Sequence, residues 1–477
     1  MASSIYPDYP PELSDARRQF LLTNLKDWSI ANGLAVRPAP SYVPQQQDPD
    51  LSLATTAPVT LFPSLFPRSC FEHGIKIQTA YNKLYSAIAQ DEDLTLGLFR
   101  SDYMVHVDPS NSSATPELKQ VEFNTIASSF GGLSSKVSAL HQYLLSIEAF
   151  PASTTQGAVL PEPRSVPALA AGLAAAHKAY GENKEGRPQC VIFLVQDPER
   201  NVFDQRHLEY ELSGKHGIRV FRLPFHQIMA DTKLAPDRSL LYQPPHAPND
   251  SFEVTTVYFR AGYSPDEYRG DEDWSARLHL ERSKAIKCPS VLTQLAGCKK
   301  IQQVLATPNS PHLARFLPDE AEAAMLQQTF APIYPMDSSE AGKEALKLAK
   351  DPESASHYVL KPQREGGGNN IYRKAIPEFL SSTPESRWPA YIFMEMIEPP
   401  AQKNIIFRNG ELQQGGVICE LGIYGTCLWR NGKDGKAGEI LENREAGYLL
   451  RTKGDQSEEG GVAAGFGAVD SCCLIDL

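Results

Sequence analysis

The chain has 477 residues, of which 42% are hydrophobic and 22% are charged, the composition of a globular protein with a sizeable core. Its net charge of −11 disfavours nucleic acid or an anionic membrane surface as the main partner. The eight cysteines include no C-x-x-C pair, and the N-terminus lacks the apolar run of a secretory signal. We therefore expect a cytoplasmic protein with reduced thiols.

The first part of the chain is predicted to contain helices and strands in a mixed order. Leu, Ile and Ala recur at intervals of three and four residues in the predicted helices, and the predicted strands flank a polar turn. In chain order these are helices over 10–35 and 76–98, strands over 103–108 and 118–126, a helix over 133–149 and a linker over 151–165.

From about residue 186 the pattern changes to continuous apolar runs that alternate with an amphipathic helix. This pattern is typical of a small α/β unit with a largely parallel sheet. The apolar runs are "QCVIFLVQD", "IRVFRLPF" and "EVTTVYFRAGY". A long helix is predicted from Asp273 to about Leu305, and strands such as "YVLKP", "YIFMEMIEP", "NIIFRNGEL" and "GGVICELGIYG" follow it.

The segment 357–372, "HYVLKPQREGGGNNIY", places three glycines directly behind a lysine, an arginine and a glutamate. The P-loop, G-x-G-x-x-G and G-x-S-x-G patterns are absent, so these glycines need another explanation. Glycine lets backbone N–H groups approach phosphate, Lys361 can neutralise phosphate oxygens, and Glu365 can share a Mg²⁺ ion with them. The same residues also fit a β-turn with a solvent-exposed Lys–Glu pair.

A second loop of small residues, "RTKGDQSEEGGVAAGFG" at 451–467, likewise follows two cations, Arg451 and Lys453. Two such loops favour a site that closes from two sides and keeps water from a reactive intermediate. A flexible surface loop is the alternative.

Two further segments carry candidate ligands for a metal ion and for a carboxylate. In "VEFNTIASSFGG", Glu122 and Asn124 alternate and so share one face of a strand, where their oxygens suit Mg²⁺. In "FRSDYMVH", Arg100 can pair with a substrate carboxylate while Asp102 orients it. Taken alone, the first pair also fits a solvated strand edge, and the second fits a structural salt bridge.

Together with further segments, these motifs resemble the eukaryotic glutathione synthetase family. The resemblance covers residues 15 to 470 in order, through "FRSDYM", "VEFNTIASSFGG", "ERNVFDQR", "VYFRAGYSP", "KCPSVLTQLAGCKKIQQ", "VLKPQREGGGNNIY", "FMEMIEP", "CELGIYG", "LLRTK" and "GGVAAG". It implies an α/β ATP-grasp fold with glycine-rich lid loops. Residues 186–295 would form an inserted parallel α/β substrate domain, between a metal- and substrate-binding part (1–185) and a nucleotide-binding part (296–477).

The family joins γ-glutamylcysteine to glycine with ATP and Mg²⁺ through an acyl phosphate, and its members are cytosolic homodimers. The resemblance implies the same substrates and assembly here, with no nucleic-acid or membrane partner. Two alternatives stay open: another ATP-grasp carboxylate–amine ligase, for example one that uses β-alanine, and an inactive nucleotide-binding regulator.

The resemblance also implies residues that bind the nucleotide and the metal ion. The Mg²⁺ ligands would be Glu122, Asn124 and Glu365. The ATP contacts would be Lys299, Lys361, Gly366, Gly367, Gly368, Asn369, Asn370, Tyr372, Met394, Glu395, Met396, Ile397, Glu420, Lys453 and Glu459. Among them, the two lysines at 299 and 361 would contact phosphates, 394–397 would hold adenine, and the glutamate at 420 would contact the ribose.

On the substrate side, the resemblance implies contacts with the dipeptide and with the acceptor. The dipeptide contacts would be Arg100, Ser129, Glu199, Asn201, Gln205, Arg260, Ala261, Gly262 and Tyr263. Arg451, Val462 and Ala463 would lie near the joined carboxyl and glycine. The catalytic charges would come from Arg100, Lys361, Arg451 and Lys453. Ala127, Ala261 and Glu459 depart from residues common in the family.

Overall fold

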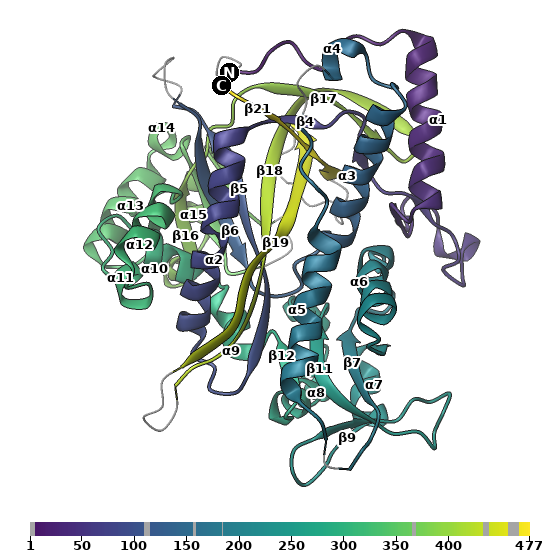
Figure 1. Cartoon of the computed structure of the whole chain (residues 1–477). Helices are drawn as coiled ribbons and strands as arrows, with labels where there is room; N and C mark the ends of the chain where they lie inside the picture. The colour runs from purple at the N-terminus through teal and green to yellow at the C-terminus, as the bar shows by residue number, and fades with distance from the viewer. Residues whose placement is uncertain are drawn as a thin grey trace.

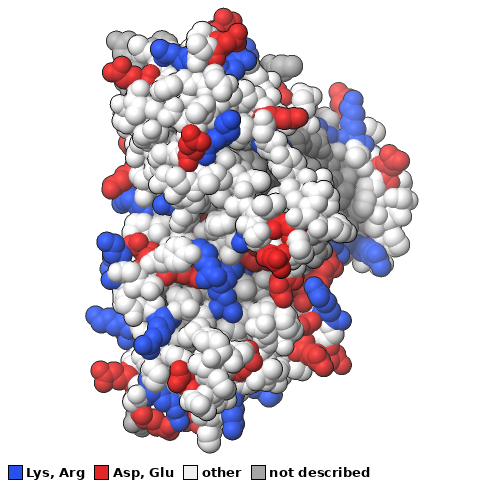
Figure 2. All heavy atoms as spheres, turned by 90° about the vertical axis from the view of Figure 1, so that its right-hand side faces the viewer, with Lys and Arg blue, Asp and Glu red and all other residues white. Residues whose placement is uncertain are grey.

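The computed structural model describes residues 5–108, 115–155, 159–183, 185–364, 369–432, 438–456 and 467–477. In this part of the chain a large sheet carries helices on both faces, and a smaller sheet lies beside it (Figure 1). The predicted α/β class is confirmed. No helix of the described ranges is both long and apolar enough to cross a bilayer. Acidic and basic side chains are interspersed on the face shown in Figure 2.

Thirteen strands of the described residues form the large sheet, whose main path is β17–β3–β20–β19–β18–β5–β12–β11–β10–β9. β6 pairs with β5, and β7 joins β11 to β8. Their bounds are β3 Val59–Thr60, β5 Thr95–His106, β6 Glu117–Asn124, β7 Gln189–Leu194, β8 Val220–Leu223, β9 Thr232–Leu234, β10 Leu240–Tyr242, β11 Phe252–Phe259, β12 Ile286–Cys288, β17 Gln402–Arg408, β18 Glu411–Arg430, β19 Glu439–Gly454 and β20 Gly467–Asp470.

Successive side chains of a strand point to opposite faces of the sheet, and in this sheet both faces carry apolar side chains. Helices therefore cover both faces. Leu421 and Ile423 of β18 join the core cluster that includes α2 (Arg68–Ala89). Tyr424 and Leu428 of the same strand join the cluster of α3 (Gly131–Ser146) and α5 (Ser165–Tyr180) on the opposite face.

The unit predicted from residue 186 has the expected parallel strands. β7 pairs in parallel with β8 and β11, and β11 pairs in parallel with β12. The short strands β9 and β10 are antiparallel. Its helices are α6 (Val202–His216), α7 (Phe225–Asp231) and α8 (Asp271–Arg282). β12 also pairs with β5, so this unit continues the large sheet.

Two predicted helices are wrong in part. The predicted helix from Asp273 to Leu305 is divided into α8, β12, α9 (Val291–Ala296) and α10 (Lys299–Ala306). Pro289 lacks an N–H group and favours an extended residue before it, and the Ser290 hydroxyl then caps α9. The helix predicted over 76–98 is α2, which ends where Gln90 adopts φ 57°.

The smaller sheet has the strand order β13–β16–β14–β15. Its strands are β13 Ile333–Pro335, β14 Tyr358–Pro362, β15 Ile371–Tyr372 and β16 Tyr391–Glu395. Leu360 and Phe393 of this sheet pack with apolar residues of α13 (Glu340–Lys350) and α15 (Ala375–Ser382). The strands predicted here from "YVLKP" and "YIFMEMIEP" are confirmed.

The other elements of the described residues are helices and four short strands, and these strands form two further sheets of two strands each. The N-terminal helix begins where the Ser14 hydroxyl accepts a hydrogen bond from the Arg17 amide. These elements are α1 Asp15–Ala31, β1 Ala35–Val36, β2 Thr55–Thr56, β4 Ser64–Pro67, α4 Ala152–Thr155, α11 His312–Phe316, α12 Glu320–Gln328, α14 Pro352–Ala355 and β21 Cys472–Ile475. The predicted linker therefore contains a short helix, α4.

A buried carboxylate near the C-terminus should make stability depend on pH. Ser64 Oγ and Thr452 Oγ1 each donate to Asp470 Oδ2 at 2.6 Å, and burial raises the pKa of Asp470 to about 6. The raised pKa stabilises the folded state below about pH 4, and this stabilisation is lost as pH rises through 6.

We expect the stability advantage of wild type over Asp470→Asn to fall by about 3 kcal/mol between pH 4 and pH 7. The backbone amides of Ser64 and Ser471 donate to Asp470 Oδ1, and asparagine keeps one oxygen for them. The two hydroxyls can turn to accept from its NH₂ group. Thermal unfolding of both proteins across this pH range is the measurement. A difference that does not change with pH would contradict the raised pKa.

Candidate active site

Alternate residues of neighbouring strands place charged side chains on one face of the large sheet. Arg100 and Asp102 of β5 lie opposite Asn124 and Glu122 of β6, respectively. The even-numbered face of β5 begins with Leu96 and Leu98, which are both buried in the core cluster of α3 and α5. The same face therefore changes from apolar to charged along the strand.

The next two strands extend this charged face. Gly422 of β18 lies opposite Asp102, and Glu420 lies opposite Arg451 of β19. Arg451 Nη2 donates to Asp102 Oδ2 at 2.9 Å and also contacts Glu420. Burial raises the pKa of Glu420, and the Arg451 charge opposes this effect. Lys453 lies two residues beyond Arg451 and so belongs to the same face.

Asp102 binds one edge of the Arg100 guanidinium through both of its carboxylate oxygens. Arg100 Nε donates to Asp102 Oδ1 at 2.6 Å, and Nη2 donates to Oδ2 at 2.8 Å. Burial lowers the pKa of Arg100, but the Asp102 carboxylate outweighs burial and raises it. Nη1 donates to the Ser129 carbonyl at 3.0 Å. Because a guanidinium carries five N–H groups, its two terminal nitrogens can still reach a substrate carboxylate.

The Glu122 carboxylate lies among positive charges. Lys299 Nζ is 3.4 Å from Glu122 Oε2, and Lys361 Nζ donates to the Val121 carbonyl at 3.2 Å. Burial raises the pKa of Glu122, but nearby cations, Lys299 and Lys361 first, outweigh it and lower the pKa to about 2. An ionised carboxylate is therefore present at neutral pH, as a cation ligand requires.

The second predicted metal ligand, Asn124, lies on the same strand. Its Nδ2 donates to Asp102 Oδ2 at 2.9 Å and to the Arg100 carbonyl at 3.3 Å. Across the described ranges no group of three or more His, Cys, Asp or Glu side chains could hold a metal ion. A Mg²⁺ ion bound with phosphates needs only one or two carboxylates. Glu122 and Asn124 fit such a partial set.

The smaller sheet brings the predicted nucleotide residues to the charged face. The buried Lys361 is on β14, which pairs with β16, the strand that leads into the predicted adenine segment 394–397. Met394 and Ile397 share an apolar cluster against which Val121 of β6 and Tyr372 pack. Lys299 Nζ also donates to the Arg364 carbonyl at 3.0 Å, so α10 is tied to the chain just after β14.

Within the predicted adenine segment, two backbone amides already have partners. The Glu395 amide donates to the Pro332 carbonyl at 3.0 Å, and the Met396 amide donates to the His357 carbonyl at 2.8 Å. Adenine would therefore have to use other backbone groups of this segment. Nearby, Asn370 Nδ2 donates to Tyr372 Oη at 3.0 Å.

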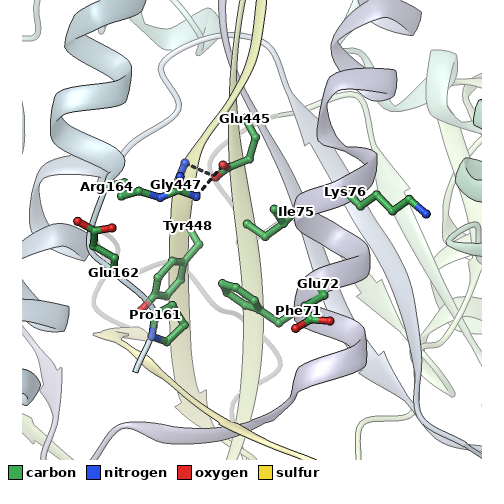
Figure 3. Close-up of a pocket in the computed structure, with 10 residues that line it drawn as sticks. All are labelled: Phe71, Glu72, Ile75, Lys76, Pro161, Glu162, Arg164, Glu445, Gly447 and Tyr448. Atoms are coloured by element: carbon green, nitrogen blue, oxygen red, sulfur yellow. Dashed lines mark hydrogen bonds and ion pairs between the residues drawn. The ribbon is translucent and has the colours of Figure 1, made fainter. Parts of the chain in front are cut away.

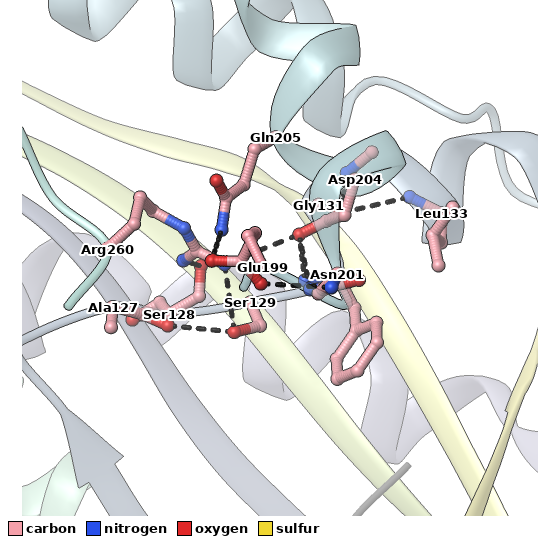
Figure 4. A network of polar contacts seen from close by, with 12 residues as sticks. Ala127, Ser128, Ser129, Gly131, Leu133, Glu199, Asn201, Asp204, Gln205 and Arg260 are labelled. Atoms are coloured by element: carbon pink, nitrogen blue, oxygen red, sulfur yellow. Dashed lines mark hydrogen bonds and ion pairs between the residues drawn. The ribbon is translucent and has the colours of Figure 1, made fainter. Parts of the chain in front are cut away.

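Several of the predicted dipeptide residues meet at the loop before α3, and Figure 4 shows Ser129, Glu199, Asn201, Gln205 and Arg260 there. Arg260 donates to the Ser128 carbonyl and to Ser129 Oγ, both at 3.0 Å, and lies 3.5 Å from Asp204 Oδ2. Arg260 Nε and Asn201 Oδ1 are buried and have no hydrogen-bond partner among the described residues. These two atoms have hydrogen-bonding capacity that the described residues do not satisfy.

Glu199 and Gln205 form the other half of this network. Gln205 Nε2 donates to Glu199 Oε2 at 2.7 Å, and the Asn201 amide donates to Glu199 Oε1 at 2.9 Å. Arg222 Nη2 donates to Gln205 Oε1 at 2.7 Å, which fixes the orientation of the glutamine amide. The structure thus brings these residues together as a hydrogen-bonded group.

The family model for the eukaryotic glutathione synthase ATP-binding domain matches residues 15–94 and 92–474 of this chain. The chain belongs to the eukaryotic glutathione synthase family. Among its relatives, the glutathione synthetase large chain of Schizosaccharomyces pombe is 38% identical over 472 residues, which cover 88% of this chain and 91% of that protein. Glutathione synthetase of Homo sapiens is 37% identical over 483 residues, covering 93% and 94%.

The chain also resembles a chloroplastic relative and a solved structure. The chloroplastic glutathione synthetase of Solanum lycopersicum is 37% identical over 462 residues, covering 88% of this chain and 78% of that protein. A glutathione synthetase-like effector from Globodera pallida, solved in apo form, superposes with a TM-score of 0.73 at 20% identity. The match covers 97% of this chain and 98% of the effector, which supports the ATP-grasp fold.

Some residues assigned from the family resemblance lie outside the described residues. These are Glu365, Gly366, Gly367, Gly368, Glu459, Val462 and Ala463. Their roles stay predictions, as do the domain boundaries at 185/186 and 295/296.

Beyond the Arg260 side chain, the loop 260–263 would contribute to the site through its backbone and its tyrosine. The Ala261 methyl group is buried in the apolar cluster of the parallel unit, so only its backbone can meet a ligand. Gly262 adopts φ 85°, and its carbonyl accepts from Gln294 Nε2 at 3.0 Å. Tyr263 Oη accepts from Gln196 Nε2 at 3.0 Å.

Sequence reasoning did not identify Asp204 as part of the site. Its carboxylate accepts from the amides of Phe130 and Gly132, both at 2.8 Å, and so caps α3 from another helix. A Cβ atom on Gly132 would lie 2.4 Å from the Asp204 carbonyl oxygen, which explains this glycine of "SSFGG". Asp204 is the aspartate of the segment "ERNVFDQR", but sequence spacing alone does not pair this residue with α3.

A surface pocket lies apart from these residues. It has a volume of about 220 Å³ and lies between α2, the chain before α5, and β19 (Figure 3). Phe71, Ile75 and Tyr448 form part of its lining, and Arg164 pairs with Glu445 at its edge at 3.0 Å. None of the site residues assigned from the family resemblance lines this pocket.

Proposed function

We propose that this chain joins γ-glutamylcysteine to glycine using ATP, through an acyl-phosphate intermediate. The observation that carries the proposal is the convergence of Arg100, Lys299 and Lys361 with Glu122 and Asn124 at one face of the sheet. This arrangement supports charge neutralisation where a triphosphate meets a carboxylate. Membership of the glutathione synthase family supplies the substrate class.

In the first proposed step, a cysteinyl carboxylate oxygen forms a bond to the γ-phosphorus while the bond to the β–γ bridging oxygen breaks and ADP leaves. Both reactants are anions, so the step is slow unless positive charges neutralise them. Arg100 would hold the carboxylate, and Lys361 would bind the transferred phosphoryl group. A Mg²⁺ ion held by Glu122, Asn124 and Glu365 would neutralise phosphate charge.

In the second step, the glycine ammonium group first loses one proton, and its nitrogen then bonds to the acyl carbon. The carbon–oxygen bond to phosphate breaks, and the nitrogen loses a second proton as the amide forms. The reaction needs no nucleophilic side chain, so positioning supplies much of the rate. Arg451 and Lys453 would neutralise charge near the joined carboxyl. Val462 and Ala463 would shape a small acceptor pocket that favours glycine over β-alanine by about 1–3 kcal/mol.

The remaining contacts follow the same assignment. ATP would be held by Lys299, Asn369, Asn370, Tyr372, the segment 394–397, Glu420 and Glu459, under the glycines 366–368. The dipeptide would lie against Ser129, Glu199, Asn201, Gln205 and the loop 260–263. The unpartnered Arg260 Nε and Asn201 Oδ1 support this position.

Phosphate release with ATP, Mg²⁺ and γ-glutamylcysteine, with and without glycine, tests the proposal. We expect release that depends on all four components and a tripeptide product visible by mass spectrometry. Faster ligation of β-alanine would identify a different ligase of the same fold. Nucleotide binding with no phosphate release would identify an inactive regulator.

We also propose a cytoplasmic homodimer, which rests on family resemblance. Light scattering after gel filtration would give the mass of the assembly, for which a value near twice 52.6 kDa is expected. A mass near 52.6 kDa would contradict the dimer.

A further inference from the structure

Asp102 lies where three strands of the candidate site meet, and its side chain has 0% exposure. Its two oxygens accept hydrogen bonds from Arg100 on β5, Asn124 on β6 and Arg451 on β19. Three side chains thus donate to one carboxylate. Because this carboxylate is not exposed, water cannot replace it as their acceptor. Removing it would leave the buried Arg100 guanidinium without its carboxylate partner, and Asn124 and Arg451 would each lose one acceptor.

We infer that Asp102 is a positioning residue that fixes the Asn124 amide so that its oxygen faces the metal side of the site. The inference rests on the proposed function and deepens it. Two acceptors, Asp102 Oδ2 at 2.9 Å and the Arg100 carbonyl at 3.3 Å, lie at one end of the Asn124 amide. Only the NH₂ group can serve both, so Oδ1 must point the other way. Oxygen is the atom that Mg²⁺ binds.

A glycine on the adjacent strand is required for this arrangement. A Cβ atom on Gly422 would lie 2.7 Å from Arg100 Cδ and 2.9 Å from Asp102 Oδ1. Arg100 and Asp102 are both held by hydrogen bonds and cannot give way without breaking them. Gly422 therefore leaves the space in which Asp102 reaches its three partners.

Asp102→Asn tests the role directly, because asparagine keeps the shape but lacks one acceptor. Binding of Mn²⁺ in the presence of ADP, followed by electron paramagnetic resonance, reports on the metal site without any turnover. We expect Mn²⁺ affinity to fall by about 10–100-fold, as for other residues that orient a metal ligand. The KM for γ-glutamylcysteine should rise as well, because Arg100 loses its orientation.

The matched control is Asp91→Asn, which changes another buried aspartate that accepts from Thr293 Oγ1 at 2.6 Å. It should leave Mn²⁺ binding unchanged. Combining Asp102→Asn with Asn124→Ala completes a double-mutant cycle. If Asp102 acts through Asn124, the double variant binds Mn²⁺ no more weakly than Asn124→Ala alone.

If the losses of Mn²⁺ affinity in the two single variants multiply in the double variant, the positioning role is overturned while the proposed function stays intact. A wild-type protein that binds no Mn²⁺ with ADP would instead overturn the proposed metal site itself. If Asp102→Asn does not fold, Gly422→Ala tests the same point. It should weaken Mn²⁺ binding and raise the KM for the dipeptide, and normal values of both would overturn the inference.

Discussion

Glu122→Gln should lower kcat by on the order of 100-fold or more, even at saturating Mg·ATP. The substitution keeps the size of the side chain but removes the negative charge that lies among Lys299, Lys361 and Arg100. The proposed metal position then loses one of its two carboxylates, and the positive charges around residue 122 lose the negative charge that Glu122 supplied. Phosphate release over a Mg²⁺ series with both substrates present measures the effect.

Glu117→Gln is the matched control, because Glu117 lies on the same strand, with its side chain 57% exposed, and pairs with Lys119. Its turnover should equal that of wild type. If Glu122→Gln kept near-normal turnover at all Mg²⁺ concentrations, Glu122 would not be a metal ligand.

The second large effect is expected for Lys361→Met, with a loss in kcat of about 10²–10³-fold, typical of removing one preorganised group that stabilises developing charge. Methionine is an unbranched side chain only one atom shorter than the buried lysine, and it carries no charge. Attack of one anion on another then lacks part of its neutralisation. Steady-state rates against ATP concentration separate this loss from weaker nucleotide binding.

Lys374→Met provides the comparison for this position, since Lys374 is an exposed lysine just before α15 in the same part of the chain. It should change neither kcat nor the KM for ATP. A Lys361→Met variant whose only defect was a raised KM would mean that Lys361 binds ground state and transition state equally.

Local patterns in the sequence predicted much of this fold. Alternation put Glu122 and Asn124 on one strand face, and the strand register shows that they face Asp102 and Arg100. Apolar runs predicted the parallel strands after residue 186, and the strands of the smaller sheet were found from their own segments. The metal and substrate roles of these residues stay predictions.

Features that depend on distant parts of the chain were not predictable. The segment 273–305 has helical composition, but β12 forms there because it can pair with both β11 and β5. Tertiary pairing thus overrides local helical preference. Asp204 is 72 residues from Gly132, which it caps, and no spacing rule links the two.

The strand β5 pairs with β6 and β18 of the candidate site and also with β12 of the parallel unit. It therefore joins the parallel unit to the rest of the large sheet. Asp204 and Arg260 likewise reach from the parallel unit to the loop 128–132. A chimaera that exchanged residues 186–295 between two relatives would combine Asp204 and Arg260 from one parent with the loop 128–132 from the other. Recombination in this fold should therefore give working enzymes only when that loop and the exchanged segment share a parent.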